Sequence, residues 1–246
     1  MPEIREEVDK VIEDWAKDER ALSTEKVFEM SKGDKAGLPG GIDQVQVGLG
    51  WTTSGSMDID SSVVMLGDKA AVRDTVYYGK ETSSCGGVRH QGDNQTGDGD
   101  GDDEVIKVLL KGIDPEVREL YVTVNCYNGS FEAVSDAYVR MVDSVSGKEL
   151  CRYKLDASVK TDGVVFCKIY RSPNGKSWGI EALGEACSGK TAKSSGTEDV
   201  VAGLGKDSKA GRGPPKEMVK MVRRLSSKNG NGGGGDGGGG GCCTIS

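Results

Sequence analysis

The sequence predicts a mainly β protein: an antiparallel two-sheet β-sandwich with short helices, an N-terminal helix and a disordered C-terminal tail. Short stretches of alternating apolar and polar residues recur from Val27 to about Ser188, which is the pattern of a sandwich. Asn174-Gly175 separates two of these stretches and is the strongest short-range signal for a β-hairpin. The 246 residues can accommodate one such domain with extensions, or two small domains.

The first extension, residues 1–21, is expected to be an amphipathic helix that docks on the sandwich. Charged residues surround an apolar stripe at helical spacing, formed by Ile4, Val8, Val11, Trp15 and Leu22. About three heptads is the bare minimum for a coiled coil, so docking is the preferred interpretation and the coiled coil stays the alternative. The sandwich is expected to span residues 22–190 and the tail residues 191–246.

Within the sandwich, we expect strands wherever apolar and polar residues alternate or an apolar run is short. In chain order these are residues 45–51, 57–66, 105–110, 120–127, 137–143, 148–155, 163–171 and 177–187. Ser144 to Gly147 has the length of a hairpin turn, and residues 131–135 are expected to form one helical turn. The remaining structure is expected to be antiparallel.

A stretch from His90 to Glu104, HQGDNQTGDGDGDDE, indicates a cation site. It contains no Lys or Arg, and its six carboxylates are Asp93, Asp98, Asp100, Asp102, Asp103 and Glu104. Like charges about 5 Å apart repel by about 1 kcal/mol in water and by several times more where they are partly buried. Glycines allow sharp turns that bring oxygens together, and such hard ligands suit Ca²⁺. The stretch is therefore predicted to bind calcium.

The two alternatives to a calcium loop are an EF-hand and a solvated acidic loop. An EF-hand fails, because its sixth position would be Asp103 instead of Gly and its twelfth Leu109 instead of Glu. Most runs of acidic residues in proteins are solvated surface loops. The loop, however, leads directly into the apolar run at residues 105–110, so the carboxylates are expected near the core.

The remaining composition narrows the class of protein. A net charge of −7 and a pI near 5.0 argue against binding of nucleic acid. Seven cysteines without C-x-x-C pairs favour reduced thiols in the cytosol. No apolar run approaches the ~18 residues of a membrane span.

Four motifs together resemble the TerD family of tellurium-resistance and stress-response domains: GLGW at residues 48–51, DID at 58–60, VRHQGDNQTGDGDGDDE at 88–104 and the following VIKVLL. The resemblance covers roughly residues 22–188 and implies a calcium-binding β-sandwich without established catalytic activity. It also implies that Asp58 and Asp60 join the acidic loop. An Asp-x-Asp pair on a strand points both side chains to one face, where burial without a cation would be costly.

The pool of expected ligands for one or two Ca²⁺ ions follows from the loop and the resemblance. It comprises Asp58, Asp60, Asp93, Asn94, Asp98, Asp100, Asp102, Asp103 and Glu104. His90 is expected to be a structural hydrogen-bonding residue, because Ca²⁺ prefers oxygen. Many relatives carry an acid where this chain has Thr52, and a hydroxyl is a weaker ligand. One site is therefore expected to be weakened or completed by water.

Residues 184–191, GEACSGKT, match the phosphate-binding P-loop pattern. That pattern works where a parallel strand leads into the loop and a helix follows. Here the preceding strand belongs to a hairpin, and the following segment shows no apolar periodicity. We therefore expect a protein that is not an enzyme, with a P-loop NTPase as the remote alternative. A cyclic-nucleotide binding module, the role described for some eukaryotic relatives, is the nearer one.

The tail carries signals for membrane attachment. Residues 191–213 are poor in apolar residues and are expected to be disordered, whereas 214–228 predict a basic amphipathic helix that suits an anionic membrane surface or calmodulin. A glycine-rich linker follows. The chain ends in CCTIS, which fits a prenylation box on Cys243 with Cys242 as a candidate for palmitoylation. Arg223-Arg224-Leu225-Ser226 fits a basophilic kinase site, so phosphate on Ser226 would weaken membrane binding.

The sequence therefore predicts a calcium-binding protein of stress response or signalling. It is expected to be lipid-anchored on the cytosolic face of a membrane, with an unidentified protein partner that responds to the calcium state.

Overall fold

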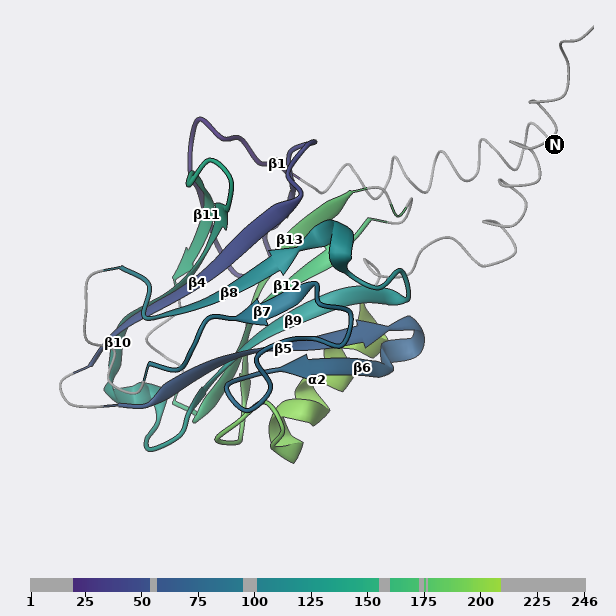
Figure 1. Ribbon diagram of the computed structural model, residues 1–246. Helices are drawn as coiled ribbons and strands as arrows, with labels where there is room; N and C mark the ends of the chain where they lie inside the picture. Colours follow the sequence, from purple (N-terminus) through teal and green to yellow (C-terminus); the bar gives the residue numbers. More distant parts are fainter. Residues whose placement is uncertain are drawn as a thin grey trace, which may run out of the picture.

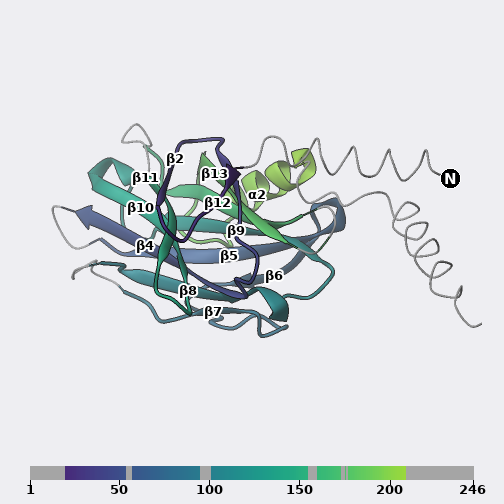
Figure 2. The same ribbon diagram turned by 90° about the horizontal axis from the view of Figure 1, so that it is seen from above.

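The computed structural model describes residues 20–53, 57–94, 101–154, 160–172, 175 and 177–208. Two sheets pack face to face, as expected for a β-sandwich (Figures 1 and 2). The seven-stranded sheet has the order β1 (Arg20–Ala21), β3 (Lys35–Gly37), β13 (Trp178–Cys187), β12 (Gly163–Arg171), β9 (Val117–Cys126), β5 (Ile59–Gly67) and β6 (Val72–Val76).

The six-stranded sheet completes the sandwich. Its order is β2 (Phe28–Met30), β11 (Glu149–Lys154), β10 (Val134–Asp143), β4 (Gln44–Thr53), β8 (Glu104–Leu109) and β7 (Val88–His90). Within the described ranges, three short 3₁₀ helices lie between strands: η1 (Asp68–Ala70), η2 (Leu110–Gly112) and η3 (Phe131–Ala133). The last of these is the helical turn expected at residues 131–135.

Alternation along β9 shows why these residues form a buried central strand. Leu120, Val122 and Val124 point into the core between the sheets, where they join apolar residues of both layers. Tyr121 points to the opposite face and belongs to a second, smaller apolar cluster. Both faces of the strand are covered, so the sequence 120–127 is apolar nearly throughout.

The hairpin turns use glycine where the backbone requires it. Gly147 has φ +70° and donates its N–H to the carbonyl of Asp143 at 2.8 Å, which closes the turn between β10 and β11. Gly175 has φ +71° and donates to Ser172 O at 2.8 Å between β12 and β13. Both conformations lie in the left-handed region that favours glycine, and both hairpins confirm the prediction.

Three features of the β-structure differ from the expectation. β1 pairs with β3, and β2 with β11, in parallel, so the sandwich is not wholly antiparallel. β2, β3, β6 and β7 lie outside the predicted strand ranges, because they are short and partly polar. Arg20–Ala21 are extended instead of helical, since Leu22 is buried in the core and donates its N–H to Gly37 O at 2.9 Å. The rest of the expected N-terminal helix, residues 1–19, lies outside the described residues.

The segment expected to be disordered after residue 190 contains a helix. α2 (Ser195–Asp207) packs on the outer face of the seven-stranded sheet, below β9 and β6 in Figure 1. Its apolar side chains Val200, Val201 and Leu204 lie against a cluster that includes Val64 and Tyr121. These three positions, with Thr197, follow the i, i+3, i+4, i+7 spacing of an amphipathic helix, a pattern that the polar composition concealed.

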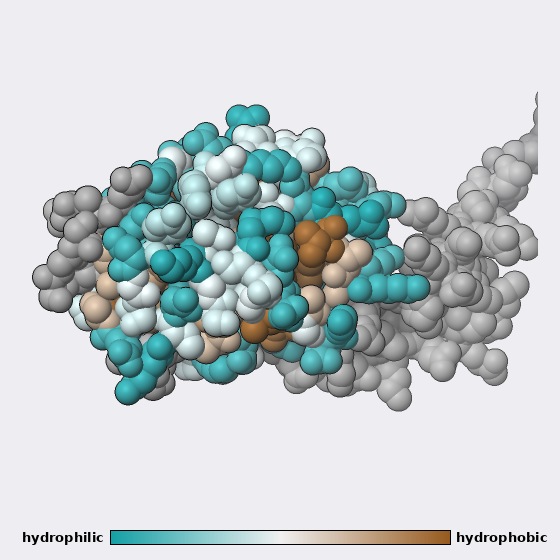
Figure 3. Space-filling view, turned by 90° about the horizontal axis from the view of Figure 1, so that it is seen from below, coloured by the Kyte–Doolittle hydropathy of each residue, from teal (hydrophilic) through white to brown (hydrophobic). Residues whose placement is uncertain are grey.

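The face seen in Figure 3 is largely hydrophilic, with hydrophobic residues confined to small patches. Within the described residues, no helix is long and apolar enough to cross a membrane. Cys126, Cys151, Cys167 and Cys187 are buried thiols, and Cys85 is an exposed one.

Candidate metal site

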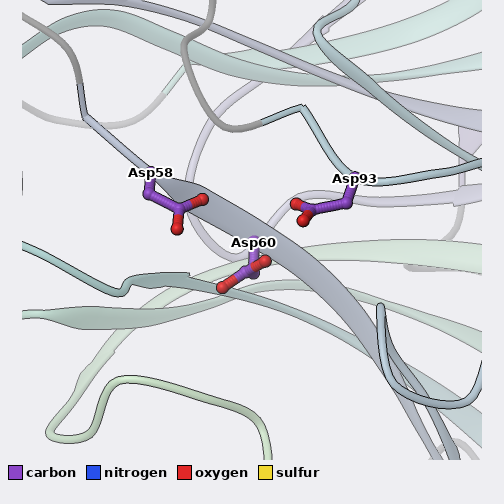
Figure 4. A group of neighbouring side chains, drawn as sticks. All are labelled: Asp58, Asp60 and Asp93. Atoms are coloured by element: carbon purple, nitrogen blue, oxygen red, sulfur yellow. The ribbon is translucent and has the colours of Figure 1, made fainter.

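Three aspartates converge where β5 begins. Asp58 lies just before the strand, Asp60 is its second residue, and Asp93 comes from the loop after β7 (Figure 4). Each offers one carboxylate oxygen, and these oxygens all lie within 4.8 Å of one another. Residues 33 positions apart in the chain thus form one group, which contains carboxylates only.

Burial makes this group costly without a cation. Asp60 is only 4 % exposed, and burial together with the charges of Glu104, Asp58 and Asp93 raises its pKa from 3.8 to about 7. Burial and the charges of Asp93 and Glu104 raise the pKa of Asp58 as well. Oδ1 of Asp58 is buried and has no hydrogen-bond partner in the described part of the chain. A hard divalent cation would satisfy these oxygens and offset the repulsion.

Glu104 holds the frame of the group from inside the sandwich. Its Oε2 accepts a hydrogen bond from the backbone N–H of Ser61 at 2.6 Å, and its Oε1 accepts one from Asn94 N at 3.5 Å. Glu104 therefore joins β8 to β5 and to the loop after β7. Its charge also acts on Asp60, although it is not one of the three converging carboxylates.

His90 is buried beside Glu104 and plays the structural role expected of it. Its Nδ1 accepts a hydrogen bond from Gly92 N at 3.3 Å, and its Nε2 lies 3.4 Å from Glu104 Oε2. Burial lowers the pKa of His90, but its hydrogen bond and attraction to Glu104 outweigh this and raise the value overall. The ring thus supports the carboxylate that orients the strand.

The neighbouring acids of the motif have other partners. Asp102 receives two hydrogen bonds from Arg140, Nε to Oδ1 at 2.7 Å and Nη2 to Oδ2 at 3.0 Å. Asp103 accepts a hydrogen bond from Trp51 N at 2.9 Å. These contacts fasten the C-terminal end of the loop to β10 and β4.

Of the nine expected ligands, the structure therefore brings together Asp58, Asp60 and Asp93, with Glu104 behind them. Asn94 lies beside the group through its backbone contact with Glu104. Asp98 and Asp100 fall in residues 95–100, outside the described residues, as do Ser226, Cys242, Cys243 and the basic segment 214–228.

Asn125 is a residue at the site that the sequence did not single out. It lies on β9 directly opposite Asp60 of β5. Arg140 was missed as well. The available signal for Asn125 is that it is a polar residue within the largely apolar sequence VTVNCY. That it lies opposite Asp60 becomes known only from the strand register.

The P-loop-like residues 184–191 are placed differently from a phosphate site. β13 is antiparallel to its neighbours, and α2 begins only at Ser195, although a helix does follow, contrary to the prediction. The N–H of Gly189 donates to Asp162 Oδ1 at 2.9 Å, so a carboxylate already occupies the place of an anion. Lys190 Nζ lies over the Tyr127 ring, 5.8 Å from its centroid.

The sandwich and its carboxylate group define a class of protein, a β-sandwich with a candidate site for a hard divalent cation. The sequence matches the TerD domain over residues 27–194, and the chain belongs to this family.

Comparisons with known proteins agree with this assignment. The chain is 40 % identical over 164 residues to Tellurium resistance protein TerZ of Serratia marcescens, covering 61 % of this chain and 83 % of that protein. It is 35 % identical over 190 residues to Stress response protein SCP2 of Bacillus subtilis (strain 168), covering 67 % and 92 %. The fold resembles the crystal structure of a homologue of telluride resistance protein TerD from Streptomyces coelicolor A3(2), with a TM-score of 0.52 and 19 % identity, over 62 % of this chain and 94 % of that one.

Proposed function

We propose that this TerD-family chain is a calcium-binding protein of stress response or signalling, tethered to the cytosolic face of a membrane. The observation that carries the calcium proposal is the group formed by Asp58, Asp60 and Asp93, whose oxygens lie within 4.8 Å of one another around a nearly buried carboxylate. Carboxylate oxygens are the ligands that Ca²⁺ prefers. Asp102 is left out of the ligand set, because Arg140 already neutralises it.

The names of the relatives support the biological setting. Tellurium resistance and stress response are properties of the named proteins of Serratia marcescens and Bacillus subtilis. We infer that this chain responds to cellular stress, and that calcium neutralises the carboxylates of Asp58, Asp60 and Asp93 and so alters the surface that an unidentified partner protein binds. Its action requires no catalytic step, in keeping with the hydrogen bonds that already occupy the P-loop-like segment.

The calcium proposal is tested by calorimetric titration of Ca²⁺ into the full chain after chelator treatment. Wild type is expected to bind, and Asp58→Ala and Asp60→Ala are each expected to abolish measurable heat. Arg118→Met, which removes an exposed ion pair with Asp68 on another part of the surface, is the matched control and should bind as wild type does. Absence of heat in wild type, with no calcium-dependent change in melting temperature, would reject the proposal.

The membrane proposal rests on the sequence of the tail. A lipid on Cys243 and the basic segment 214–228 would supply two attachment signals, whereas one lipid alone gives marginal binding. The farnesylated chain should sediment with vesicles containing phosphatidylserine. A Cys243→Ser variant should remain in the supernatant, and Ser226→Glu should bind the vesicles more weakly because it reduces the positive charge. Equal sedimentation of wild type and Cys243→Ser would contradict lipid anchoring.

A further inference from the structure

Asn125 lies between the candidate metal site and α2. It pairs with Asp60 across β9 and β5, and cross-strand partners in an antiparallel pair share one face with Cβ atoms about 4.5–5.5 Å apart. The other neighbour of Asn125 is Gly163 of β12. The side chain of Asn125 is therefore placed between the strand that carries Asp60 and the strands that support α2.

The amide nitrogen of Asn125 has a fixed direction. It donates to the carbonyl oxygen of Gly189 at 2.6 Å and lies 3.1 Å from Thr197 Oγ1, in the first turn of α2. A carbonyl oxygen can only accept, so the nitrogen and not the oxygen of the amide faces Gly189. A Cβ at Gly163 would lie 2.6 Å from this nitrogen, so the nitrogen sits over β12. The amide oxygen is thereby turned back toward β5.

That oxygen is a buried acceptor without a partner. Asn125 is 0 % exposed, and its Oδ1 receives no hydrogen bond from any of the residues that the structure describes. Such orphaned acceptors are rare in folded proteins and call for a specific explanation. Its cross-strand neighbour Asp60 belongs to the carboxylate group, where Oδ1 of Asp58 is likewise buried without a partner. Side-chain amide oxygens are, like carboxylates, ordinary ligands of Ca²⁺.

We propose that Asn125 provides its amide oxygen to the cation held by Asp58, Asp60 and Asp93, and that the same side chain makes the docking of α2 depend on calcium. This inference rests on the proposed calcium function. One end of the amide binds the cation, and the other end binds the loop and helix at Gly189 and Thr197. Ordering either end pre-organises the other, so cation binding and helix docking stabilise each other, and the coupling is reciprocal.

The coupling would extend the calcium response beyond the matched domain. The TerD match ends at residue 194, one residue before α2 begins, and α2 is the element from which the tail continues. A calcium-bound site holds the first turn of α2 in place through Thr197, which is completely buried. Loss of calcium loosens that turn.

The test uses the full chain and Ca²⁺ alone as the probe. Asn125→Leu removes the oxygen and the donor at nearly constant volume, and we expect it to weaken calcium binding in calorimetry about 10-fold. The matched control is Thr123→Val, an isosteric change two residues along the same face of β9, where Oγ1 is also buried without a partner. It should bind calcium as wild type does.

Hydrogen exchange measures the second half of the proposal. In wild type, calcium should slow exchange of the amides in α2 severalfold, and in Asn125→Leu this protection should vanish. Thr197→Val touches only the helix side of Asn125. By reciprocity it should weaken calcium binding by a few-fold without removing a ligand.

The outcomes separate this inference from the calcium proposal. If wild type fails to bind calcium, the proposed function fails. If wild type binds and Asn125→Leu and Thr197→Val bind equally well, Asn125 is a structural residue only and the inference is overturned, even where the variants melt earlier. Should Asn125→Leu not fold, the affinity of Thr197→Val and the exchange of α2 in wild type still decide the question. Identical exchange of α2 with and without calcium would refute the coupling.

Discussion

The acidic motif contributes one aspartate, Asp93 or Asp102, to each of two carboxylate groups that differ in how their charge is compensated. Asp102 lies with Glu149 between two arginines: Arg140 binds both acids, and Arg152 donates to Glu149 Oε1 at 2.7 Å. Asp60 lies with Asp58 and Asp93, and the nearest charges that act on it are mainly other carboxylates. The hydrogen bond from Arg152 holds the pKa of Glu149 below its usual value, whereas the pKa of Asp60 rises to about 7. The protein neutralises the group around Asp102 with its own arginines, and we propose that an external cation neutralises the group around Asp60.

The largest effect on stability is expected from removing the charge of Asp60 in the group formed by Asp58, Asp60 and Asp93. Calcium at 100 times its Kd should stabilise wild type by about 2.7 kcal/mol, which corresponds to a rise in Tm of about 5–10 °C. Asp60→Asn should lose this rise, because the central ligand has lost its charge. Without calcium the variant should melt at or above the wild-type temperature, because a repelled, buried charge is gone.

Differential scanning calorimetry with calcium and with chelator measures both temperatures. Asp103→Asn is the control. Asp103 lies only ten residues after Asp93 in the chain, but it accepts a hydrogen bond from Trp51 N, so the variant should keep the calcium-dependent rise in Tm. A calcium-dependent rise that survives in Asp60→Asn would remove the distinction between the two groups.

How much of this contrast the sequence can predict depends on the type of interaction. Local alternation predicted β4, β5, β9 and both hairpins, because strand periodicity and turn residues are local properties. Composition and resemblance predict the Asp-x-Asp pair and Asp93 as ligands, and the structure brings these three carboxylates together. Composition could not distinguish Asp102 from Asp60, because Arg140 lies 38 residues away and reaches Asp102 only through the pairing of β10 with β4. Asn125 was missed for the same reason.

Breaking the neutralised group should cost stability regardless of calcium. Arg140→Met leaves Asp102, whose side chain is 5 % exposed, without its bidentate partner, and deprives Glu149 of one of two arginines. Leaving buried charge uncompensated should cost about 2–3 kcal/mol. Urea unfolding should show this loss equally in chelator and in calcium.

Arg118→Met serves as the comparison variant for that experiment. Its ion pair with Asp68 has side chains that are 30 % and 44 % exposed, so its removal should cost less than about 1 kcal/mol. Equal losses in the two variants would show that the Arg140 group is an ordinary surface pair.

The two groups should also respond to pH with opposite sign. In the calcium-free protein the pKa of Asp60 is about 7, above its usual 3.8. Between these two pH values the native state binds more protons than the unfolded state, so stability rises as pH falls from about 8 to 5. The pKa of Glu149 is lowered from 4.5, so its contribution is present above that value and is lost as pH falls below it.

Chelator-treated wild type should therefore gain about 1–2 kcal/mol between pH 8 and pH 5, and Asp60→Asn should gain less. Glu149→Gln should instead flatten the loss below about pH 4.5. Urea unfolding at a series of pH values resolves both. A wild-type stability that falls steadily from pH 8 to pH 5 would mean that Asp60 is already neutralised within the chain.

The smallest expected effect on stability tests the Asp102 group by a steric change instead of a change in charge. Gly48 of β4 pairs with Arg140 of β10, and a Cβ on Gly48 would overlap the carboxylate of Asp102. Gly→Ala within a strand normally stabilises by about 0.5–1 kcal/mol through the unfolded chain. Here that gain should be cancelled or reversed, because Arg140 prevents Asp102 from moving aside.

In the background of Asp102→Ala the obstacle is gone, so Gly48→Ala should regain its stabilising effect. A double-mutant cycle by urea unfolding measures this coupling. Strict additivity would show that the Asp102 side chain moves aside easily and is not held by Arg140. A coupling of about 1 kcal/mol that is the same with and without calcium would show that the Asp102 group is structural and distinct from the cation site.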